Sequence, residues 1–313
     1  MPLVSVLMSS YNHEAYLPIA IESVLNQTFK DFELIILDDA SSDHSKEVIR
    51  YYSKRDPRIR AYFHKKNRGI ARTMNDLLAK ANGKYVATFA SDDVWAKNKL
   101  EKQMAVLKEN DNLVVWTEGE VIDKNGNPTG ELFTHIHGAA KKKKKSGWIL
   151  NELLEGNFIC SQSVLVKRKN IVRIGYDERL KYVNDYKLML DLAAKYEFYF
   201  IPEPLTQYRI HGRNTIISKR KELRREELII SQYVLEKYGK DMSPKTMSRV
   251  YFNMAHAYLT LGNRLESARF TLRGFLLDPI SVASLKSIAS CVLGERLSAA
   301  LRPIYRKIQP YLE

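Results

Sequence analysis

The strongest constraint on the fold is an alternation of short apolar segments with helical patterns in the N-terminal part of the chain. Between strand-length apolar runs, apolar side chains recur at helical spacing. The runs are Val4–Met8, Phe32–Leu37, Ile59–Phe63 and Tyr85–Phe89, and the helical stretches are residues 14–26, 41–52 and 69–81. Strands and helices in this order predict an α/β fold, with a mostly parallel, Rossmann-like central sheet flanked by helices.

Polar clusters follow three of these predicted strands. They are Ser9–Asn12, Asp38–Asp39 and Ser91–Asp93. Ligands of open α/β sheets bind beyond the carboxyl ends of the strands. The order of the residues therefore predicts that these polar side chains converge on one crevice.

The pattern changes after residue 112. Strands are expected at Leu113–Thr117 and Glu120–Asp123, followed by a turn at Asn125–Gly126, and later at Ser163–Val166 and Phe198–Ile201. Helices are expected at Gly147–Leu154 and at residues 184–195, and the chain is mostly helical from residue 219. We therefore expect an α/β domain over residues 1–218, with halves of about 1–112 and 113–218, and a basic helical extension over residues 219–313.

The positive charge is concentrated in two segments. The chain has 50 Lys and Arg against 36 Asp and Glu, a net charge of +14. Residues 219–313 hold 17 basic and 9 acidic residues, and Lys141–Lys145 is an unbroken basic run. The near-neutral remainder argues against a nucleic-acid binder. The basic segments instead suggest a surface for an anionic membrane, and the C-terminal helices could also form a homodimer.

Cysteine usage and hydropathy narrow the class further. Cys160 and Cys291 are far apart, so zinc-finger and disulfide-rich scaffolds are excluded. No apolar stretch reaches the roughly 18 residues of a membrane span, and the N-terminus lacks the basic start of a signal peptide. We expect a cytoplasmic protein, with peripheral attachment to the inner face of the membrane as an option.

Taken together, seven motifs in order resemble family 2 glycosyltransferases of the GT-A fold. They are Val4–Asn12, Ser23–Thr28, Phe32–Asp43, Asn67–Arg72, Gly83–Asp93, Tyr182–Tyr186 and Tyr208–His211, and the match spans about residues 3–215. The resemblance implies an inverting hexosyl- or N-acetylhexosaminyltransferase. Its donor would be a nucleotide-sugar, in the first instance a UDP-sugar, and its acceptor a glycan or lipid-linked precursor of a surface polysaccharide.

The resemblance implies a divalent cation, Mn²⁺ or Mg²⁺, bound at the aspartate pair Asp92–Asp93. Such a cation neutralises charge on the leaving diphosphate, and it prefers oxygen ligands. Of Asp92 and Asp93, one would bind the metal and the other the donor ribose, with Asp93 favoured for the metal. The family often reads Asp-x-Asp-Asp here, but this chain has Ala90, which leaves the division open. His211 would meet the metal or the diphosphate.

Other residues match positions that bind the nucleotide. Asp39 would accept the imide N–H of uracil, since a carboxylate is an acceptor. Ser9 and Tyr11 would line the same base, Tyr11 by stacking. Arg72 has five donors suited to the base carbonyl or to the phosphates. For Asp38, a turn-capping role is as good an interpretation as ligand contact.

Asp185 matches the catalytic base of the family. It holds the second position of a Glu-Asp motif whose first position is Asn184 in this chain. A general base need only take the acceptor's proton as its oxygen attacks C1 of the sugar, and direct attack from the opposite face inverts that carbon. Asp177, Glu178 and Asp191 are the next candidates.

Two other functional classes stay open from sequence alone. A metal-dependent nucleotidyltransferase would share the α/β fold and the carboxylates, but it would release pyrophosphate instead of a nucleoside diphosphate. A catalytically degenerate nucleotide- or glycan-binding module would account for the missing acids at Ala90 and Asn184. An RNA-binding role for the basic extension is disfavoured, because the chain lacks basic–aromatic RNA motifs.

Overall fold

The computed structural model describes residues 1–137, 144–212, 214, 219–281, 283–285 and 287–291. The chain divides into two compact units. The first comprises Met1–Leu150 and Asn157–Gly212, and the second comprises Asn151–Gly156 and Arg213–Glu313.

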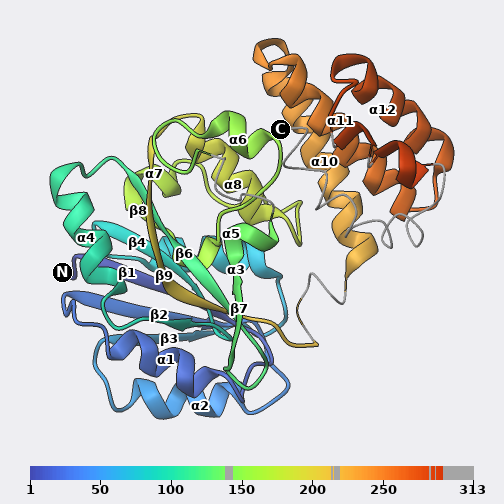
Figure 1. The fold of residues 1–313 in the computed structure, drawn as a ribbon. Coiled ribbons are helices and arrows are strands. Elements are labelled where there is room, and N and C mark those ends of the chain that lie inside the picture. Colours follow the sequence, from blue (N-terminus) through green and yellow to red (C-terminus); the bar gives the residue numbers. More distant parts are fainter. Residues whose placement is uncertain (138–143, 213, 215–218, 282, 286, 292–313) are drawn as a thin grey trace. The chain divides into compact units, whose positions relative to one another are not determined.

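The four apolar runs of the N-terminal part form four neighbouring parallel strands. They are β1 (Val4–Ser10), β2 (Phe32–Asp38), β3 (Ile59–Phe63) and β4 (Tyr85–Ala90), and their order in the sheet is β3-β2-β1-β4. The prediction of a parallel α/β arrangement is confirmed for this half. Since all four strands run the same way, their carboxyl ends lie at one edge of the sheet (Figure 1).

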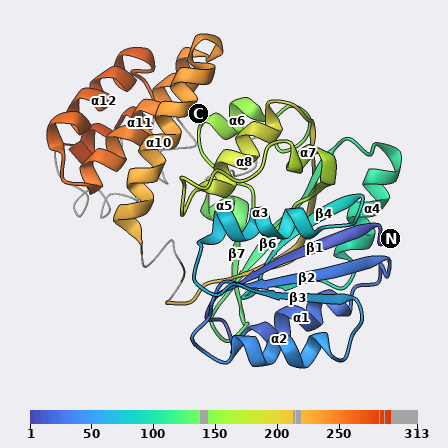
Figure 2. The same ribbon diagram turned by 180° about the vertical axis from the view of Figure 1, so that it is seen from behind.

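Helices cover both faces of these strands. The buried side chains of α1 (Leu17–Leu25), α2 (Ser45–Ser53) and α4 (Lys99–Glu109) share one core with alternate residues of β1 and β2. Figure 2 shows α3 (Ile70–Lys80) on the opposite face. Burial on both faces explains why the strands are apolar without interruption.

The second half of the unit extends the sheet with strands of both directions. β8 (Leu165–Lys167) is antiparallel to β4 and to β6 (Val114–Ile122), and β9 (Phe198–Arg209) is parallel to β6. β5 (Val94–Trp95) forms the edge beyond β9, and β7 (Pro128–Leu132) pairs with β6. The sheet is therefore mixed.

The prediction of two strands at Leu113–Thr117 and Glu120–Asp123 is wrong. One strand, β6, runs through both, with a register irregularity against β9 around Glu118. The buried Glu118 carboxylate accepts hydrogen bonds from the amides of Gly119 and Thr134 at 2.9 and 3.2 Å. In the sequence, a charged residue in an apolar run suggests the end of a strand. Here nearby amides satisfy the buried Glu118 carboxylate, and the pairing of β6 with β9 continues on both sides of it.

Short helices and turns complete the first unit: α5 (Phe133–Ile136), the 3₁₀ turn η1 (Ser161–Ser163), α7 (Arg168–Val172) and α8 (Asn184–Ala193). A further short helix, α6 (Leu150–Leu154), falls largely in the second unit. The helix expected at residues 184–195 is thus present. Its first residue, Asn184, is buried, and the side-chain amide of Asn184 donates to the backbone carbonyls of Leu180 and Lys181, each at 3.4 Å.

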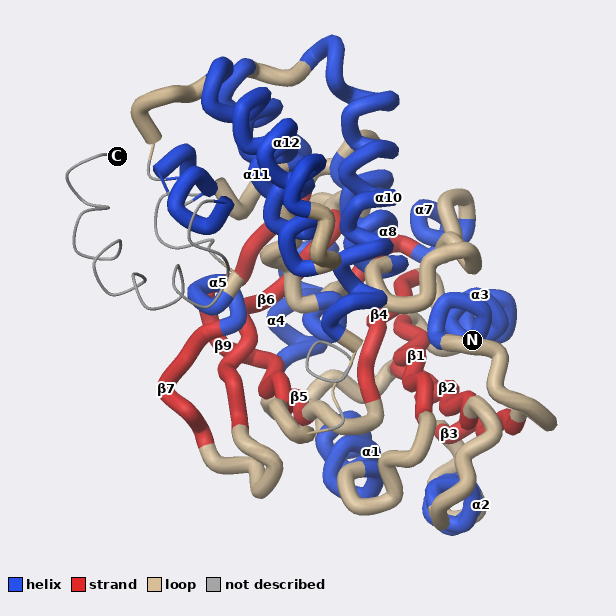
Figure 3. Tube along the Cα trace, turned by 90° about the vertical axis from the view of Figure 1, so that its right-hand side faces the viewer, coloured by secondary structure: helices blue, strands red, loops and turns tan. Residues whose placement is uncertain are grey.

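Helices make up most of the described residues of the second unit (Figure 3). It contains α10 (Arg220–Tyr238), the turn η2 (Gly239–Asp241), α11 (Pro244–Thr260) and α12 (Arg264–Leu277). α11 and α12 approach closely at Gly274, where an added Cβ would lie 2.5 Å from the Phe252 ring. Within the described residues, no helix combines the length and apolar content that a membrane crossing requires.

Candidate active site

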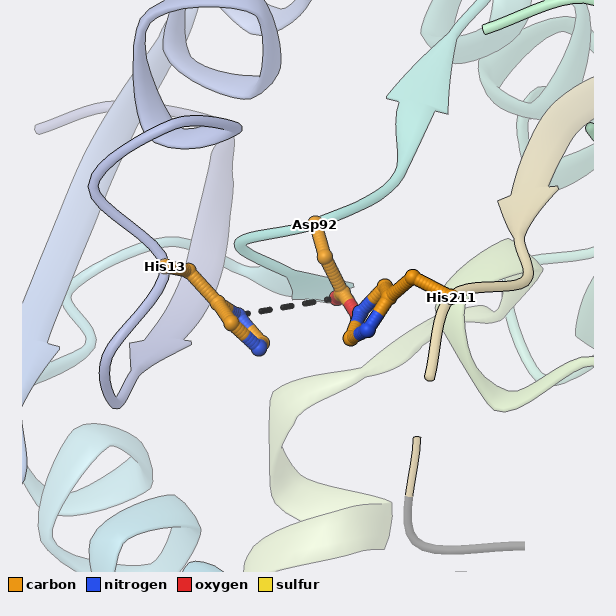
Figure 4. Close-up of side chains that lie close together, drawn as sticks. All are labelled: His13, Asp92 and His211. Atoms are coloured by element: carbon orange, nitrogen blue, oxygen red, sulfur yellow. Dashed lines mark hydrogen bonds and ion pairs between the residues drawn. The ribbon is translucent and has the colours of Figure 1, made fainter. Parts of the chain in front are cut away.

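Three loops at the carboxyl ends of β1, β4 and β9 bring His13, Asp92 and His211 together (Figure 4). Asp92 Oδ2 lies 3.1 Å from His211 Nε2, and Asp92 Oδ1 lies 3.9 Å from His13 Nδ1. One ligand atom from each residue falls within 4.8 Å of the other two. This donor set, one carboxylate and two imidazoles, can hold a divalent cation.

Strand pairing explains why residues so distant in sequence meet. Directly after Asp93, β5 pairs antiparallel with β9, and Val94 lies opposite Gln207. This register places the residues before Val94 beside those after Gln207. Asp92 and His211 are therefore adjacent because the chain turns from β4 onto the edge of β9.

Aromatic contacts fix the two imidazole rings. The His211 ring stacks on Tyr16 with ring centroids 5.1 Å apart, and it meets the His13 ring edge to face at 5.6 Å. His13 Nδ1 also lies 2.8 Å from Ser91 Oγ. Sequence reasoning missed His13, although it directly follows the polar cluster Ser9–Asn12.

Asp93 has a different environment from Asp92. Its side chain is buried, and Oδ1 accepts a hydrogen bond from the Arg209 amide at 2.8 Å. Burial and the neighbouring Asp92 charge raise the pKa of Asp93 well above its usual value. Burial opposes ionisation of Asp92 as well, but the His211 hydrogen bond and the charges of both histidines outweigh it and lower the pKa of Asp92. The structure thus joins His211 to Asp92, and not to the residue favoured for the metal.

Arg209 holds this region together and was not singled out from sequence. Its buried guanidinium donates from Nε to the Asp92 carbonyl at 2.7 Å, and it lies over the Tyr16 ring at 4.9 Å. It also donates to the Asp123 carbonyl at 3.2 Å. The residue lies two positions before His211 in the quoted Tyr208–His211 motif, which was the available signal.

Asp39 lies at the end of β2 and accepts several hydrogen bonds. The amides of Arg68 and Gly69 donate to Oδ1 and Oδ2 at 2.8 and 2.9 Å, and His64 Nδ1 lies 2.7 Å from Oδ1. Gly69 has a φ of +82°, a conformation that favours glycine and directs these amides toward Asp39. By contrast, Asp38 is fully buried and caps its own turn through the Ser41 amide at 2.9 Å.

The remaining predicted nucleotide contacts lie around the same edge. Ser9 is partly exposed in β1, paired with Leu37 and Ala90, and Tyr11 follows with 48% of its surface exposed. Arg72 is on α3 and forms ion pairs with Asp76 at 3.3 Å and Glu178 at 3.1 Å. The Arg72 guanidinium is therefore bound by two acids in this structure.

Asp185 lies in the first turn of α8. Its Oδ1 accepts the Tyr186 amide at 2.7 Å, and the Ser161 hydroxyl donates to the carboxylate. Burial nevertheless raises its pKa. The Ser161 carbonyl in turn accepts a hydrogen bond from the Thr88 hydroxyl of β4, so Ser161 connects Asp185 to the strand that precedes Asp92.

Tyr208, near the end of β9, lies in a negatively charged environment. Burial and the charges of Asp93, Cys160, Asp92 and Asp185 raise its pKa.

The other candidates for the base are engaged in ion pairs. Asp177 pairs with Arg179 at 2.7 Å, Asp191 pairs with Lys187 at 2.8 Å, and Glu178 pairs with Arg72. Asp185 instead accepts hydrogen bonds from an amide and a hydroxyl.

The Lys141–Lys145 run is described only at its end. Lys141–Lys143 lie outside the described residues. The Lys145 carbonyl accepts a hydrogen bond from Trp116 Nε1 at 3.1 Å, and its ammonium lies 5.5 Å from the Phe200 ring centroid. The described end of the run is thus attached to the first unit.

Comparison with known proteins decides the family. The sequence profile described as Glycosyl transferase family 2 matches residues 5–168. The chain belongs to glycosyltransferase family 2. An uncharacterized glycosyltransferase of Methanocaldococcus jannaschii is 33% identical over 257 residues, which is 80% of this chain and 84% of that protein. TuaG of Bacillus subtilis, a glycosyltransferase named for teichuronic acid biosynthesis, is 31% identical over 67% of this chain and 79% of its own length.

Solved structures support the fold expected for this glycosyltransferase. S. aureus TarS 1-349 superposes with a TM-score of 0.65 at 15% identity, covering 99% of this chain and 92% of that one. The mannosyltransferase PcManGT of Pyrobaculum calidifontis, solved with GDP-Man and Mn²⁺, gives 0.57 at 16% identity, covering 98% of this chain and 82% of that one. The expectation of a GT-A fold with C-terminal helices is confirmed.

Proposed function

We propose that this family 2 glycosyltransferase moves a hexosyl or N-acetylhexosaminyl group from a UDP-sugar to a hydroxyl of a glycan or lipid-linked acceptor, with inversion. The observation that carries the proposal is the convergence of Asp92, His211 and His13 at the carboxyl edge of the sheet, where Asp39 also follows β2. Crystal structures of TarS with UDP and with UDP-GlcNAc support the choice of nucleotide.

The donor set fits a transition-metal ion better than Mg²⁺. Mg²⁺ favours an all-oxygen shell, whereas an imidazole nitrogen also suits Mn²⁺ and its neighbours. We assign the metal-binding role to Asp92 with His211, and His13 as a third ligand. Asp93 then has a structural role, in which its buried carboxylate accepts a hydrogen bond from the Arg209 backbone amide. The ion, when bound, neutralises charge on the leaving diphosphate.

Asp39 is the proposed reader of the uracil ring. Two backbone amides and His64 orient its carboxylate before any ligand arrives. The exposed Tyr11 ring can stack on the base, and Ser9 lies two residues before it on β1. Arg72 can bind the base carbonyl or the phosphates only if its ion pair with Glu178 breaks.

Asp185 is the proposed general base. Its carboxylate takes the proton of the acceptor hydroxyl while that oxygen forms a bond to C1 of the sugar. The bond between C1 and the diphosphate oxygen breaks on the opposite face, which inverts the anomeric carbon. Burial raises the pKa of Asp185, and a raised pKa makes it a better proton acceptor.

The acceptor and the site of action are also proposals. The similarity to TuaG supports a surface polysaccharide precursor as the acceptor. We propose a cytoplasmic enzyme in which residues 1–218 form the catalytic domain and residues 219–313 contact an anionic membrane. The exposed side of α12 supports this contact, because leucines alternate there with arginines: Arg264, Leu265, Arg269, Leu272, Arg273 and Leu276.

A panel of nucleotide-sugars with Mn²⁺ or Mg²⁺, scored for nucleoside diphosphate and for pyrophosphate, tests the proposal. We expect UDP release with one UDP-sugar, more with Mn²⁺, and faster with acceptor present. Pyrophosphate release would instead indicate nucleotidyl transfer. Binding of UDP without any release would indicate a degenerate module.

A further inference from the structure

One histidine joins the proposed base-reading carboxylate to a second acid. His64 follows β3, and its Nδ1 lies 2.7 Å from Asp39 Oδ1 while its Nε2 lies 3.1 Å from Asp76 Oδ2. The His64 amide donates to the Asp38 carbonyl at 2.9 Å, which fixes the loop to the end of β2. The His64 side chain is only 12% exposed, so water has little access to these contacts.

The acceptor positions of Asp39 can be counted. A carboxylate offers about four lone-pair positions, two on each oxygen. Oδ1 accepts the Arg68 amide and faces His64, and Oδ2 accepts the Gly69 amide. The two amides can only donate, so they occupy two of these positions, and a His64 Nδ1 that carries hydrogen occupies a third. Within the part of the chain that the structure describes, these contacts leave one acceptor position, on Oδ2.

We propose that His64 is a positioning residue that makes Asp39 specific for a nucleobase with one N–H donor at its reading edge. The inference rests on the proposed function, in which Asp39 reads the base. The imide N–H of uracil satisfies the one open position. Cytosine carries a lone pair at the same ring atom, and the carboxylate repels it.

Asp76 sets the direction of the His64 ring from the other side. It is on α3, and besides His64 it pairs with Arg68 at 3.2 Å and Arg72 at 3.3 Å. The Nε2 contact keeps the ring turned so that Nδ1 faces Asp39. Each ring nitrogen faces a carboxylate oxygen, so both contacts are hydrogen bonds when both nitrogens carry hydrogen.

Isosteric variants can separate the two contacts. In His64→Asn the amide nitrogen replaces Nδ1 and keeps the donor to Asp39, whereas in His64→Gln it replaces Nε2 and keeps only the donor to Asp76. His64→Phe keeps a ring and loses both donors. The measurement is calorimetry of UDP and CDP binding to the full chain with Mn²⁺, beside thermal unfolding of each variant.

We expect His64→Asn to bind UDP within about threefold of the parent, and His64→Gln and His64→Phe to bind it at least about tenfold more weakly, since Asp39 loses a buried partner. The ratio of UDP to CDP affinity should fall only in the last two. Parental UDP affinity and ratio in His64→Gln would overturn the inference. So would losses that follow unfolding temperature across all three variants, because these indicate a purely structural residue.

Asp39→Ala distinguishes this inference from the proposed function. We expect it to weaken UDP binding by about 10- to 100-fold, as for a lost hydrogen bond to a charged group. Parental UDP binding by Asp39→Ala would remove the base-reading role itself. A normal Asp39 effect with unaffected His64 variants would remove only the role of His64.

Discussion

Asp92 and His211 lie 119 positions apart in sequence, yet Asp92 Oδ2 is 3.1 Å from His211 Nε2. The contact exists because β5 leaves the end of β4 and pairs with β9 just before His211. β4 and β9 are separated in the sheet by β8 and β6, so direct strand pairing does not produce it. The proposed metal site thus depends on the short strand Val94–Trp95.

The two adjacent aspartates should behave differently when changed. Asp92→Asn should reduce metal-dependent turnover by at least about 100-fold, because a bound ion supplies several kcal/mol of charge stabilisation. Asp93→Asn keeps an oxygen for the Arg209 amide and should retain most of the metal dependence. UDP release against Mn²⁺ concentration checks both variants, with unfolding temperature as the control. The reverse order of effects would return the metal to Asp93.

The histidines should set the choice of metal. His211→Asp replaces a nitrogen ligand by oxygen, so we expect the preference for Mn²⁺ over Mg²⁺ to shrink. His13→Ala should weaken Mn²⁺ binding by about 10- to 100-fold if it is a ligand or orients one. Turnover titrated separately with each ion gives both results. An unchanged Mn²⁺ affinity in His13→Ala would show that His13 neither binds the ion nor orients one of its ligands.

Asp185→Asn tests the base. It preserves size but removes the proton acceptor, so transfer should fall by about 10²–10⁴. UDP and Mn²⁺ affinities should stay near parental values, and slow hydrolysis of the donor should survive. The measurement is UDP release with and without acceptor, beside UDP binding. Near-parental transfer would move the base to Asp177, Glu178 or Asp191, and lost UDP binding would make Asp185 part of the nucleotide site.

The pH profile tests the environment of the same residue. The base works only when it is ionised, and burial raises the pKa of Asp185. As the pH is lowered, transfer should therefore begin to decline above the pKa of an ordinary aspartate, which is about 3.9. The Ser161 hydroxyl lowers that pKa. Ser161→Ala should therefore move the acid limb of kcat/KM to still higher pH, whereas a shift to lower pH would contradict the assignment.

Membrane attachment is testable through α12. The full chain should sediment with anionic vesicles at low salt and release them at high salt, because surface charge is screened. Leu272→Ser with Leu276→Ser should reduce sedimentation, whereas Ile19→Ser, an exposed apolar change on α1, should not. A chain that instead forms a dimer which the α12 variant dissociates, without vesicle binding, would make this face a contact between two copies.

Local patterns gave the parallel half of the fold correctly. An apolar run such as Phe32–Leu37 is buried on both faces wherever it lies in such a sheet, so its own residues indicate a strand. The polar clusters after the strands likewise lie at one edge of the sheet. The prediction of two separate strands around Glu118 was wrong, because in the sequence a buried acid with local hydrogen-bond partners cannot be distinguished from the end of a strand.

The sequence by itself determined which residue types stand at the strand ends: Asp39, Asp92 and Asp93 after apolar runs, and His211 in its motif. Only the tertiary structure decided which of them meet. It joined Asp92 to His211, engaged Asp93 with the Arg209 amide, and placed His64 against Asp39. The reason is physical: strand and helix patterns depend on neighbours along the chain, whereas each of these contacts depends on the pairing and packing of distant segments.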